Sequence, residues 1–130
     1  MADTPAGPRL LMVDDEPALR KIMARLLQVA GFTVLEAATG KEGLALAGSE
    51  RPDAILLDLM LPEMNGFDVC LALKQDPATR EIPVVIFTAR GRGSDDERRC
   101  RALGAAAYFC KTDPSKEIVA ALRKLLNLAA

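Results

Sequence analysis

The chain has 130 residues and a formal net charge of −1, and 50% of its side chains are hydrophobic and 27% are charged. This length and balance predict one globular domain with a single buried core and exclude wholesale disorder. The balanced charge gives no reason to expect direct nucleic-acid contact. No apolar run is long enough to cross a membrane and there is no signal peptide, so we expect a cytoplasmic protein without a membrane partner.

Histidine and cysteine usage narrows the chemistry further. The absence of histidine excludes Ser–His and Cys–His nucleophile systems and most zinc sites. Cys70, Cys100 and Cys110 form no C-x-x-C pair and lie within apolar or helical patterns. They are therefore predicted to be buried, reduced thiols.

Apolar runs of strand length alternate along the chain with segments of helical periodicity. In chain order, the expected elements are a strand at 9–13, a helix at 17–30, a strand at 32–36, a helix at 40–48, a strand at 53–57, a helix at 66–75, a strand at 83–87, a helix at 94–103, a strand at 106–109 and a helix at 114–128. Strands that are apolar throughout and alternate with helices predict a doubly wound α/β fold. We expect residues 1–8 to be a flexible lead-in and 9–128 to form the single domain.

Local signals support these helix boundaries. They comprise two capping boxes, two prolines at first helical positions and two glycines at helix ends: Thr39 with Glu42, Ser94 with Glu97, Pro17, Pro114, Gly31 and Gly104. The first helix carries apolar side chains on one face at spacings of three and four: Leu19, Ile22, Met23, Leu26, Leu27 and Ala30. The charged helix at 94–103 allows Asp95–Arg99 and Glu97–Arg101 pairs, and both a self-paired solvated helix and an arginine-bearing output surface stay open.

Polar side chains follow four of the five expected strands. Asp14 and Asp15 follow the first strand, Asp58 the third, Thr88 the fourth and Lys111 the fifth. Each aspartate alone is better explained as a helix cap or a solvated loop residue, and a lone threonine or lysine is nearly uninformative. Because ligands of an open parallel sheet bind outside the carboxyl ends of its strands, the five together predict a site. The second strand ends in Glu-Ala-Ala, which offers nothing comparable to the site.

The charges at this edge favour one kind of chemistry. Three neighbouring carboxylates raise one another's pKa unless a cation lies between them, and Lys111 supplies only one positive charge. Oxygen ligands without histidine or cysteine suit Mg²⁺, with Mn²⁺ as the alternative. A divalent ion beside an ammonium and a hydroxyl is an arrangement that binds a phosphoryl group. Asp58 ends the central, most apolar strand and is the best candidate nucleophile.

Four segments carry a resemblance to a known family: VDDEP at 13–17, LLDLMLPEMNGFD at 56–68, FTA at 87–89 and YFCK at 108–111. In this order and at this spacing, they resemble the response-regulator receiver domain, the CheY-like phosphoacceptor module of two-component signalling. The resemblance covers essentially the whole chain. It implies a flavodoxin-like fold, with a five-stranded parallel sheet of order 2-1-3-4-5 and five helices on both faces.

The resemblance also implies how the site works. Asp58 would accept a phosphoryl group from a sensor histidine kinase, a histidine phosphotransfer protein or a small donor. Asp14, Asp15, Asp58 and the backbone carbonyl of Met60 would hold Mg²⁺. Lys111 would bridge to the phosphoryl oxygens. Such a domain is a switch and not a turnover enzyme, since it catalyses only its own phosphotransfer and autodephosphorylation.

The switch residues follow from the same resemblance. Thr88 would move toward the phosphoryl group, and Tyr108 would move inward into the vacated space. This would remodel the face formed by the fourth helix, fifth strand and fifth helix, which controls an unknown output protein or domain. Met60 and Arg90 would tune the lifetime of the acyl phosphate. Direct nucleic-acid binding is not expected, and a homodimer formed on phosphorylation is left open.

One departure from the family pattern supports an alternative. Receivers usually follow the lysine with proline, whereas Thr112 follows Lys111 here, so we expect a trans peptide at this position. The alternative is a non-phosphorylating pseudo-receiver that acts as a protein-interaction module. An aspartate phosphohydrolase is less favoured, because Asp58-Leu59-Met60 lacks its D-x-D pattern. The chain ends soon after the last expected helix, which leaves open a stand-alone regulator or a piece of a longer one.

Overall fold

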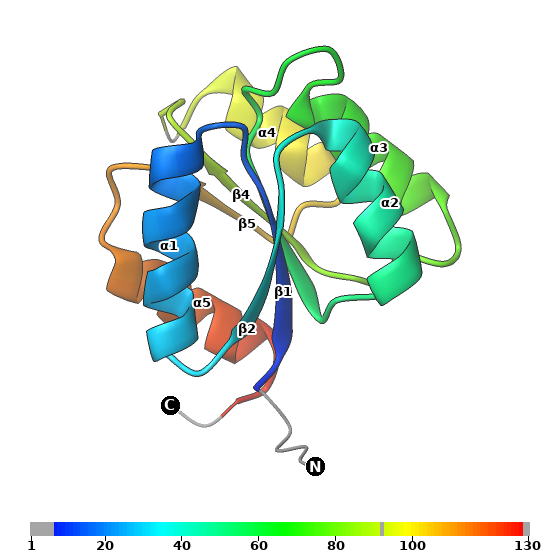
Figure 1. Ribbon diagram of the computed structural model, residues 1–130. Coiled ribbons are helices and arrows are strands. Elements are labelled where there is room, and N and C mark those ends of the chain that lie inside the picture. Colours follow the sequence, from blue (N-terminus) through cyan, green and yellow to red (C-terminus); the bar gives the residue numbers. More distant parts are fainter. Residues whose placement is uncertain (1–6, 92, 129–130) are drawn as a thin grey trace.

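The computed structural model describes residues 7–91 and 93–128, so most of the lead-in expected at 1–8 lies outside the described residues. In the described part, five strands alternate with five helices (Figure 1). The strands are β1 (Arg9–Val13), β2 (Thr33–Ala37), β3 (Ala54–Leu57), β4 (Val84–Thr88) and β5 (Ala107–Cys110). The helices are α1 (Pro17–Val29), α2 (Gly40–Glu50), α3 (Gly66–Gln75), α4 (Asp95–Ala102) and α5 (Ser115–Leu125). Each expected element is present, and the largest difference is that α5 ends at Leu125 instead of 128.

The five strands form one parallel sheet in the order β2-β1-β3-β4-β5. This confirms the predicted doubly wound α/β fold. Side chains of β1 alternate between two cores, since Leu10 and Met12 pack with α1 and α5 while Leu11 and Val13 pack with α2, α3 and α4. Figure 1 shows the same two layers of helices on either side of the sheet. In the described residues, every helix is too short or too polar to cross a lipid bilayer.

The capping boxes are confirmed with a small difference in geometry. The Thr39 side chain accepts a hydrogen bond from the Glu42 N–H at 3.1 Å, and the Ser94 side chain accepts one from the Glu97 N–H at 3.3 Å. Each glutamate carboxylate reaches back to the backbone N–H just before the cap residue, at 2.8 and 2.7 Å. Each cap side chain therefore satisfies one backbone donor of the first helical turn, and each glutamate binds a donor that precedes the helix.

Of the prolines and glycines predicted at helix ends, one proline is shifted by one position and both glycines are confirmed. Pro17 is the first residue of α1, as expected, whereas Pro114 is the cap residue and α5 begins one position later. Gly31 and Gly104 have φ angles of 105° and 104°, which lie in the left-handed region. Both glycines thus end their helices in a conformation that other residues rarely adopt.

The apolar surface of α1 is wider than the part that the sheet covers. Met23 and Leu27 are buried, but Ile22, Leu26 and Val29 are 60%, 41% and 76% exposed. The expectation of a single apolar face is therefore only half right. Residues 22, 26 and 29 follow a parallel row at spacings of four and three, and this row faces away from the core.

Helix α4 is largely self-paired, although one expected pair is wrong. Glu97 pairs with Arg101 at 3.1 Å as predicted, but Asp95 pairs with Arg98 instead of Arg99. The guanidinium of Arg99 lies 4.0 Å from the centre of the Phe67 ring on α3. A cation–π contact with a neighbouring helix therefore replaces the expected pair within α4.

Candidate functional site

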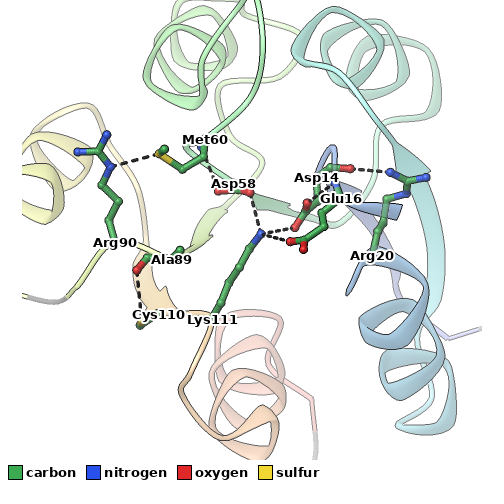
Figure 2. Close-up of polar contacts among 9 residues, drawn as sticks. All are labelled: Asp14, Glu16, Arg20, Asp58, Met60, Ala89, Arg90, Cys110 and Lys111. Atoms are coloured by element: carbon green, nitrogen blue, oxygen red, sulfur yellow. Dashed lines mark hydrogen bonds and ion pairs between the residues drawn. The ribbon is translucent and has the colours of Figure 1, made fainter. Parts of the chain in front are cut away.

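Three side chains from three strand ends converge at the carboxyl edge of the sheet. Asp14 follows β1, Asp58 follows β3 and Lys111 follows β5 (Figure 2). The ammonium Nζ of Lys111 lies 2.8 Å from Oδ2 of Asp58 and 2.9 Å from Oδ2 of Asp14. Carboxylate oxygens of Asp14, Asp15 and Asp58 all lie within 4.8 Å of one another. The structure thus brings together four of the side chains that the sequence placed at this edge.

Local turns hold the two buried aspartates in place. Asp14 Oδ1 accepts a hydrogen bond from the Glu16 N–H at 2.9 Å, and Asp58 Oδ1 accepts one from the Met60 N–H at 3.0 Å. Each side chain therefore closes its own turn at the strand end, as aspartates commonly do. The remaining oxygen of each carboxylate is left to face Lys111.

Gly66 is required by the close approach of α3 to the loop after Asp58. Its N–H donates to the Leu59 carbonyl at 3.1 Å. A Cβ atom at this position would lie 2.4 Å from the Asp58 carbonyl oxygen and 2.5 Å from the Leu59 Cα. Any larger residue would push this loop away, so the shape of the loop requires Gly66.

Burial and unequal charge set the electrostatics of the cluster. The Asp14 and Asp58 residues are 1% and 3% exposed, whereas Asp15 is exposed. Burial raises the pKa of the Asp14 carboxyl, and its contacts with Lys111 and the Glu16 N–H do not offset this. Burial alone would lower the pKa of Lys111, but the hydrogen bonds and charges of Asp58 and Asp14 raise it. Two buried carboxylates therefore share one ammonium as the partner for their negative charge.

Arg20 and Glu36 support the Asp14 turn from outside. Arg20 donates one hydrogen bond to the Asp14 carbonyl at 2.7 Å and another to the Glu36 carboxylate at 3.0 Å (Figure 2 shows the first). The Arg20 side chain is only 14% exposed. Glu36 lies on β2, the strand to which the sequence analysis gave no part in the site. β2 therefore contributes to this edge indirectly, through Glu36 and Arg20, which the sequence analysis did not expect.

The β4 side of the site contains a buried hydroxyl without a partner. Thr88 is 0% exposed, and its Oγ1 has no hydrogen-bond partner among the described residues. Tyr108 is 2% exposed, its hydroxyl donates to the Arg90 carbonyl at 3.3 Å, and burial raises its pKa. Tyr108 is therefore buried and hydrogen-bonded in this structure, which has no phosphoryl group at Asp58.

Met60 and Arg90 lie beside the acidic cluster and contact each other. The Arg90 Nε lies 3.2 Å from the Met60 sulfur (Figure 2). The Nη1 atom of the same guanidinium pairs with Asp96 of α4 at 2.9 Å. Met60 is 50% exposed. An open pocket of about 500 Å³ lies over the cluster, and Met60 lines it together with Asp58 and Lys111. This pocket therefore opens the acidic cluster to small molecules.

Comparison with known proteins identifies the family. The family model of the response regulator receiver domain matches residues 10–123. The chain belongs to this family. Over 120 residues it is 41% identical to the DNA-binding dual master transcriptional regulator RpaA of Synechocystis, covering 92% of this chain and 49% of that protein. It is 37% identical over 121 residues to the phosphate regulon regulatory protein PhoB of Pseudomonas aeruginosa, covering 93% and 52%. The chain thus spans about half the length of these relatives.

Solved structures agree with this assignment. The chemotaxis protein CheY4 of Vibrio cholerae superimposes with a TM-score of 0.85 at 29% identity, covering 93% of this chain and all (100%) of that one. The non-phosphorylated HemR receiver domain of Leptospira biflexa gives a TM-score of 0.82 at 29% identity, covering 95% and 97%. The chain is therefore a receiver domain of two-component signalling, with the flavodoxin-like sheet order that the resemblance implied.

The receiver domain departs from one further expectation at the end of β5. Cys70 and Cys100 are buried free thiols, and burial raises the pKa of Cys100 to about 12. Cys110 is also free but only partly buried, so it does not fit the prediction of a buried thiol. Its sulfur accepts a hydrogen bond from the Thr112 hydroxyl at 3.2 Å, which contributes to a lowered pKa.

Proposed function

We propose that this receiver domain is a phosphorylation-dependent signalling switch in which Asp58 accepts a phosphoryl group in a Mg²⁺-dependent reaction. The donor would be a sensor histidine kinase or a histidine phosphotransfer protein. One observation carries the proposal: the buried carboxylates of Asp14 and Asp58 both lie within 2.9 Å of Lys111 Nζ, beneath an open pocket. This combination suits a divalent cation, and that cation together with Lys111 would supply the positive charge that an incoming phosphoryl group needs.

The acidic cluster fits a hard divalent cation. Asp14 Oδ2 is buried, and among the described residues it is paired with Lys111 alone, at 2.9 Å. Asp14, Asp15, Asp58 and the Met60 backbone carbonyl would hold Mg²⁺, or Mn²⁺ in its place. When bound, the ion would supply positive charge that offsets the charge of the transferring group. The donor set of oxygen atoms is the kind that these ions prefer.

The residues of the chain would then divide the work of phosphotransfer. A carboxylate oxygen of Asp58 attacks the phosphorus, and the bond between the phosphorus and the donor nitrogen breaks as the new oxygen–phosphorus bond forms. Lys111, already hydrogen-bonded to Asp58, moves its ammonium onto a phosphoryl oxygen. The Thr88 hydroxyl, which lacks a partner among the described residues, donates to another oxygen.

The response to phosphorylation would begin on the β4 side of the site. The added group carries roughly −1.5 to −2 charge and strong acceptor oxygens. Because Tyr108 is already buried and bonded to the Arg90 carbonyl, its inward movement is not needed. We propose instead that Thr88 pulls the segment leading to α4, which changes the surface formed by α4, β5 and α5. An output protein or domain, or a second copy of this chain, would respond to that surface.

The exposed apolar row of α1 would contact the donor protein. Helix α1 begins directly after the acidic cluster, so a protein that places a phosphohistidine at Asp58 also lies over this helix. Ile22, Leu26 and Val29 are exposed there, and Lys21 and Arg25 lie beside them around a shallow groove. Exposed apolar side chains in a row are typical of protein-interaction surfaces.

The extent of the domain and its wider role remain part of this proposal. We propose residues 9–128 as the receiver domain, with 1–8 as its lead-in. RpaA is named a DNA-binding regulator, and this chain matches 49% of its length. For the chain itself, with a net charge of −1, we propose no direct nucleic-acid contact.

A mass measurement tests the central step. The protein is incubated with Mg²⁺ and acetyl phosphate, and its intact mass is recorded. We expect the wild type to gain the mass of one phosphoryl group and Asp58→Asn to gain none. Asp53→Asn, which changes an aspartate at the opposite edge of the sheet, serves as the matched control and should react like the wild type.

The same measurement separates the switch from a non-phosphorylating pseudo-receiver. That alternative depended on Thr112 in place of proline, yet the described peptide bonds are all trans and the Lys111 ammonium still contacts both buried aspartates. This contact favours the phosphorylating interpretation. A wild type that gains no mass even with Mn²⁺ in place of Mg²⁺ would support the pseudo-receiver instead.

A further inference from the structure

We propose that Asp113 is a positioning residue for Lys111, and that its side chain holds the turn which presents the ammonium to the site. The inference rests on the proposed function, because the position of Lys111 matters there only if its ammonium binds a phosphoryl group. It concerns the sequence Lys111-Thr112-Asp113, where the chain lacks a proline after the lysine.

Asp113 closes the turn at the end of β5 through two hydrogen bonds to one residue. Its carboxylate Oδ2 accepts a hydrogen bond from the Cys110 N–H at 2.8 Å. Its own N–H donates to the Cys110 carbonyl at 2.9 Å. Both polar groups of the Cys110 backbone are therefore bound by Asp113, and Lys111 and Thr112 lie in the loop between them. The two hydrogen bonds of this pairing use no side chain of the acidic cluster.

The same turn fixes where the Lys111 side chain starts. The Lys111 N–H donates to the Thr88 carbonyl at 2.7 Å, which ties the turn to the end of β4. From there the side chain, which is 13% exposed, extends to Asp58 and Asp14. A lysine side chain has four rotatable bonds, so a loose backbone would spread its ammonium over many positions. A displacement of about 1 Å at such a site is costly for positioning.

The neighbouring residues explain why a side chain is needed for this purpose. Proline restricts the backbone by fixing its own φ angle, and Thr112 does not. Asp113 precedes Pro114, and a residue before proline is held in an extended conformation. Asp113 is therefore already restricted, and its carboxylate transfers that restriction back to Cys110 across the turn.

Two affinities measured on folded protein test this role. Beryllofluoride, a phosphoryl mimic, is titrated in the presence of Mg²⁺ and followed by fluorine NMR, and Mg²⁺ alone is titrated by calorimetry. Removing the ammonium in Lys111→Ala should weaken beryllofluoride binding and strengthen Mg²⁺ binding, because the ammonium attracts the anion and repels the cation. Asp113→Ala should shift both affinities in the same directions, with beryllofluoride binding weakened about tenfold.

The conservative variant and a matched control isolate the cause. Asp113→Asn keeps an acceptor oxygen and should stay within about twofold of the wild type in both titrations. Asp53→Ala removes the same kind of bond, from Asp53 Oδ2 to the Arg9 N–H at 2.8 Å, at the opposite edge of the sheet. It should lower the thermal midpoint without changing either affinity. If Asp113→Ala does not fold, Asp113→Glu, which misplaces the carboxylate, should show the same opposite shifts.

Three outcomes would overturn the inference. Unchanged affinities in the folded Asp113 variant, beside clear shifts in Lys111→Ala, would remove the role of Asp113 and leave the proposed function intact. A fall in both affinities would indicate general loosening instead of a displaced ammonium. No shift in Lys111→Ala itself would contradict the proposed role of Lys111 and remove this inference, whereas phosphorylation of Asp58 is decided separately by the mass measurement.

Discussion

The two sides of the Asp58 site differ in how their polar groups are bound. On the α1 side, Arg20 is nearly buried and bonds both the Asp14 carbonyl and Glu36, at 2.7 and 3.0 Å. On the α4 side, the buried Thr88 hydroxyl lacks a partner in the described residues. Met60 there is half exposed and contacts the Arg90 guanidinium at 3.2 Å.

This difference suggests separate tasks for the two sides. A turn held by a largely buried arginine keeps carboxylates close together even though they repel one another, which prepares a cation site. A hydroxyl without a partner gains a hydrogen bond only when a new acceptor arrives. Helix α4 has one buried residue, Cys100, so it is weakly anchored to the sheet. We therefore expect the α1 side to bind the cation and the α4 side to respond to the phosphoryl group.

The largest expected effect is on Mg²⁺ affinity, and it should be confined to the α1 side. Asp15→Asn removes one proposed carboxylate ligand from the cluster. We expect calorimetry to show Mg²⁺ binding weakened about 100-fold, since even supporting residues of metal sites contribute 10- to 100-fold. Asp96→Asn, on the α4 side, should bind Mg²⁺ like the wild type. Equal losses in the two variants would remove the distinction between the two sides.

Two arginines allow the comparison to be sharpened. Arg20→Ala removes the support of the Asp14 turn and should weaken Mg²⁺ binding about tenfold, although Arg20 is a cation and touches no proposed ligand oxygen. Arg90→Ala removes a cation on the α4 side and should leave Mg²⁺ affinity within about twofold. Tighter Mg²⁺ binding in Arg20→Ala would mean that its positive charge, and not its support of the turn, dominates.

Thr88 and Thr79, the two threonines that are buried in the described part of the chain, should respond to the same substitution with opposite signs. Thr88→Val removes a hydroxyl that has no partner among the described residues, so the free energy of unfolding should rise by about 1 kcal/mol. Thr79→Val removes a hydroxyl that donates to the Leu73 carbonyl at 2.8 Å, so the free energy of unfolding should fall by about 1 kcal/mol. Urea unfolding followed by circular dichroism measures both. Destabilisation by Thr88→Val would show that its hydroxyl is already satisfied.

The parts of the site that could be predicted are those set by the backbone. Parallel strands bring their carboxyl ends to one edge, so Asp14, Asp58 and Lys111 could be placed together without coordinates. Alternating apolar segments likewise predicted the elements and their order along the chain. The closing of each aspartate on its own turn also follows from common local behaviour.

The parts that could not be predicted depend on long side chains and on the choice between neighbouring faces. Arg20 reaches from α1 to Glu36 on β2, and nothing in the spacing of these two residues indicates the contact. Periodicity placed Ile22 and Leu26 with the core, because adjacent rows of a helix share the same spacing. The Tyr108 hydroxyl donates to the Arg90 carbonyl, which belongs to a loop whose path the sequence does not specify.

The smallest expected effect concerns the lifetime of the phosphorylated state on the α4 side. Met60 lines the open pocket above Asp58, and its sulfur is held against Arg90. A bulky apolar side chain here should hinder an attacking water, so Met60→Asn should speed dephosphorylation about threefold, which corresponds to ~0.7 kcal/mol of barrier. Met60→Leu keeps the apolar bulk and should match the wild type. Decay of the phosphorylated mass after removal of acetyl phosphate measures the rate, and an unchanged rate in Met60→Asn would mean that Met60 does not shield the acyl phosphate.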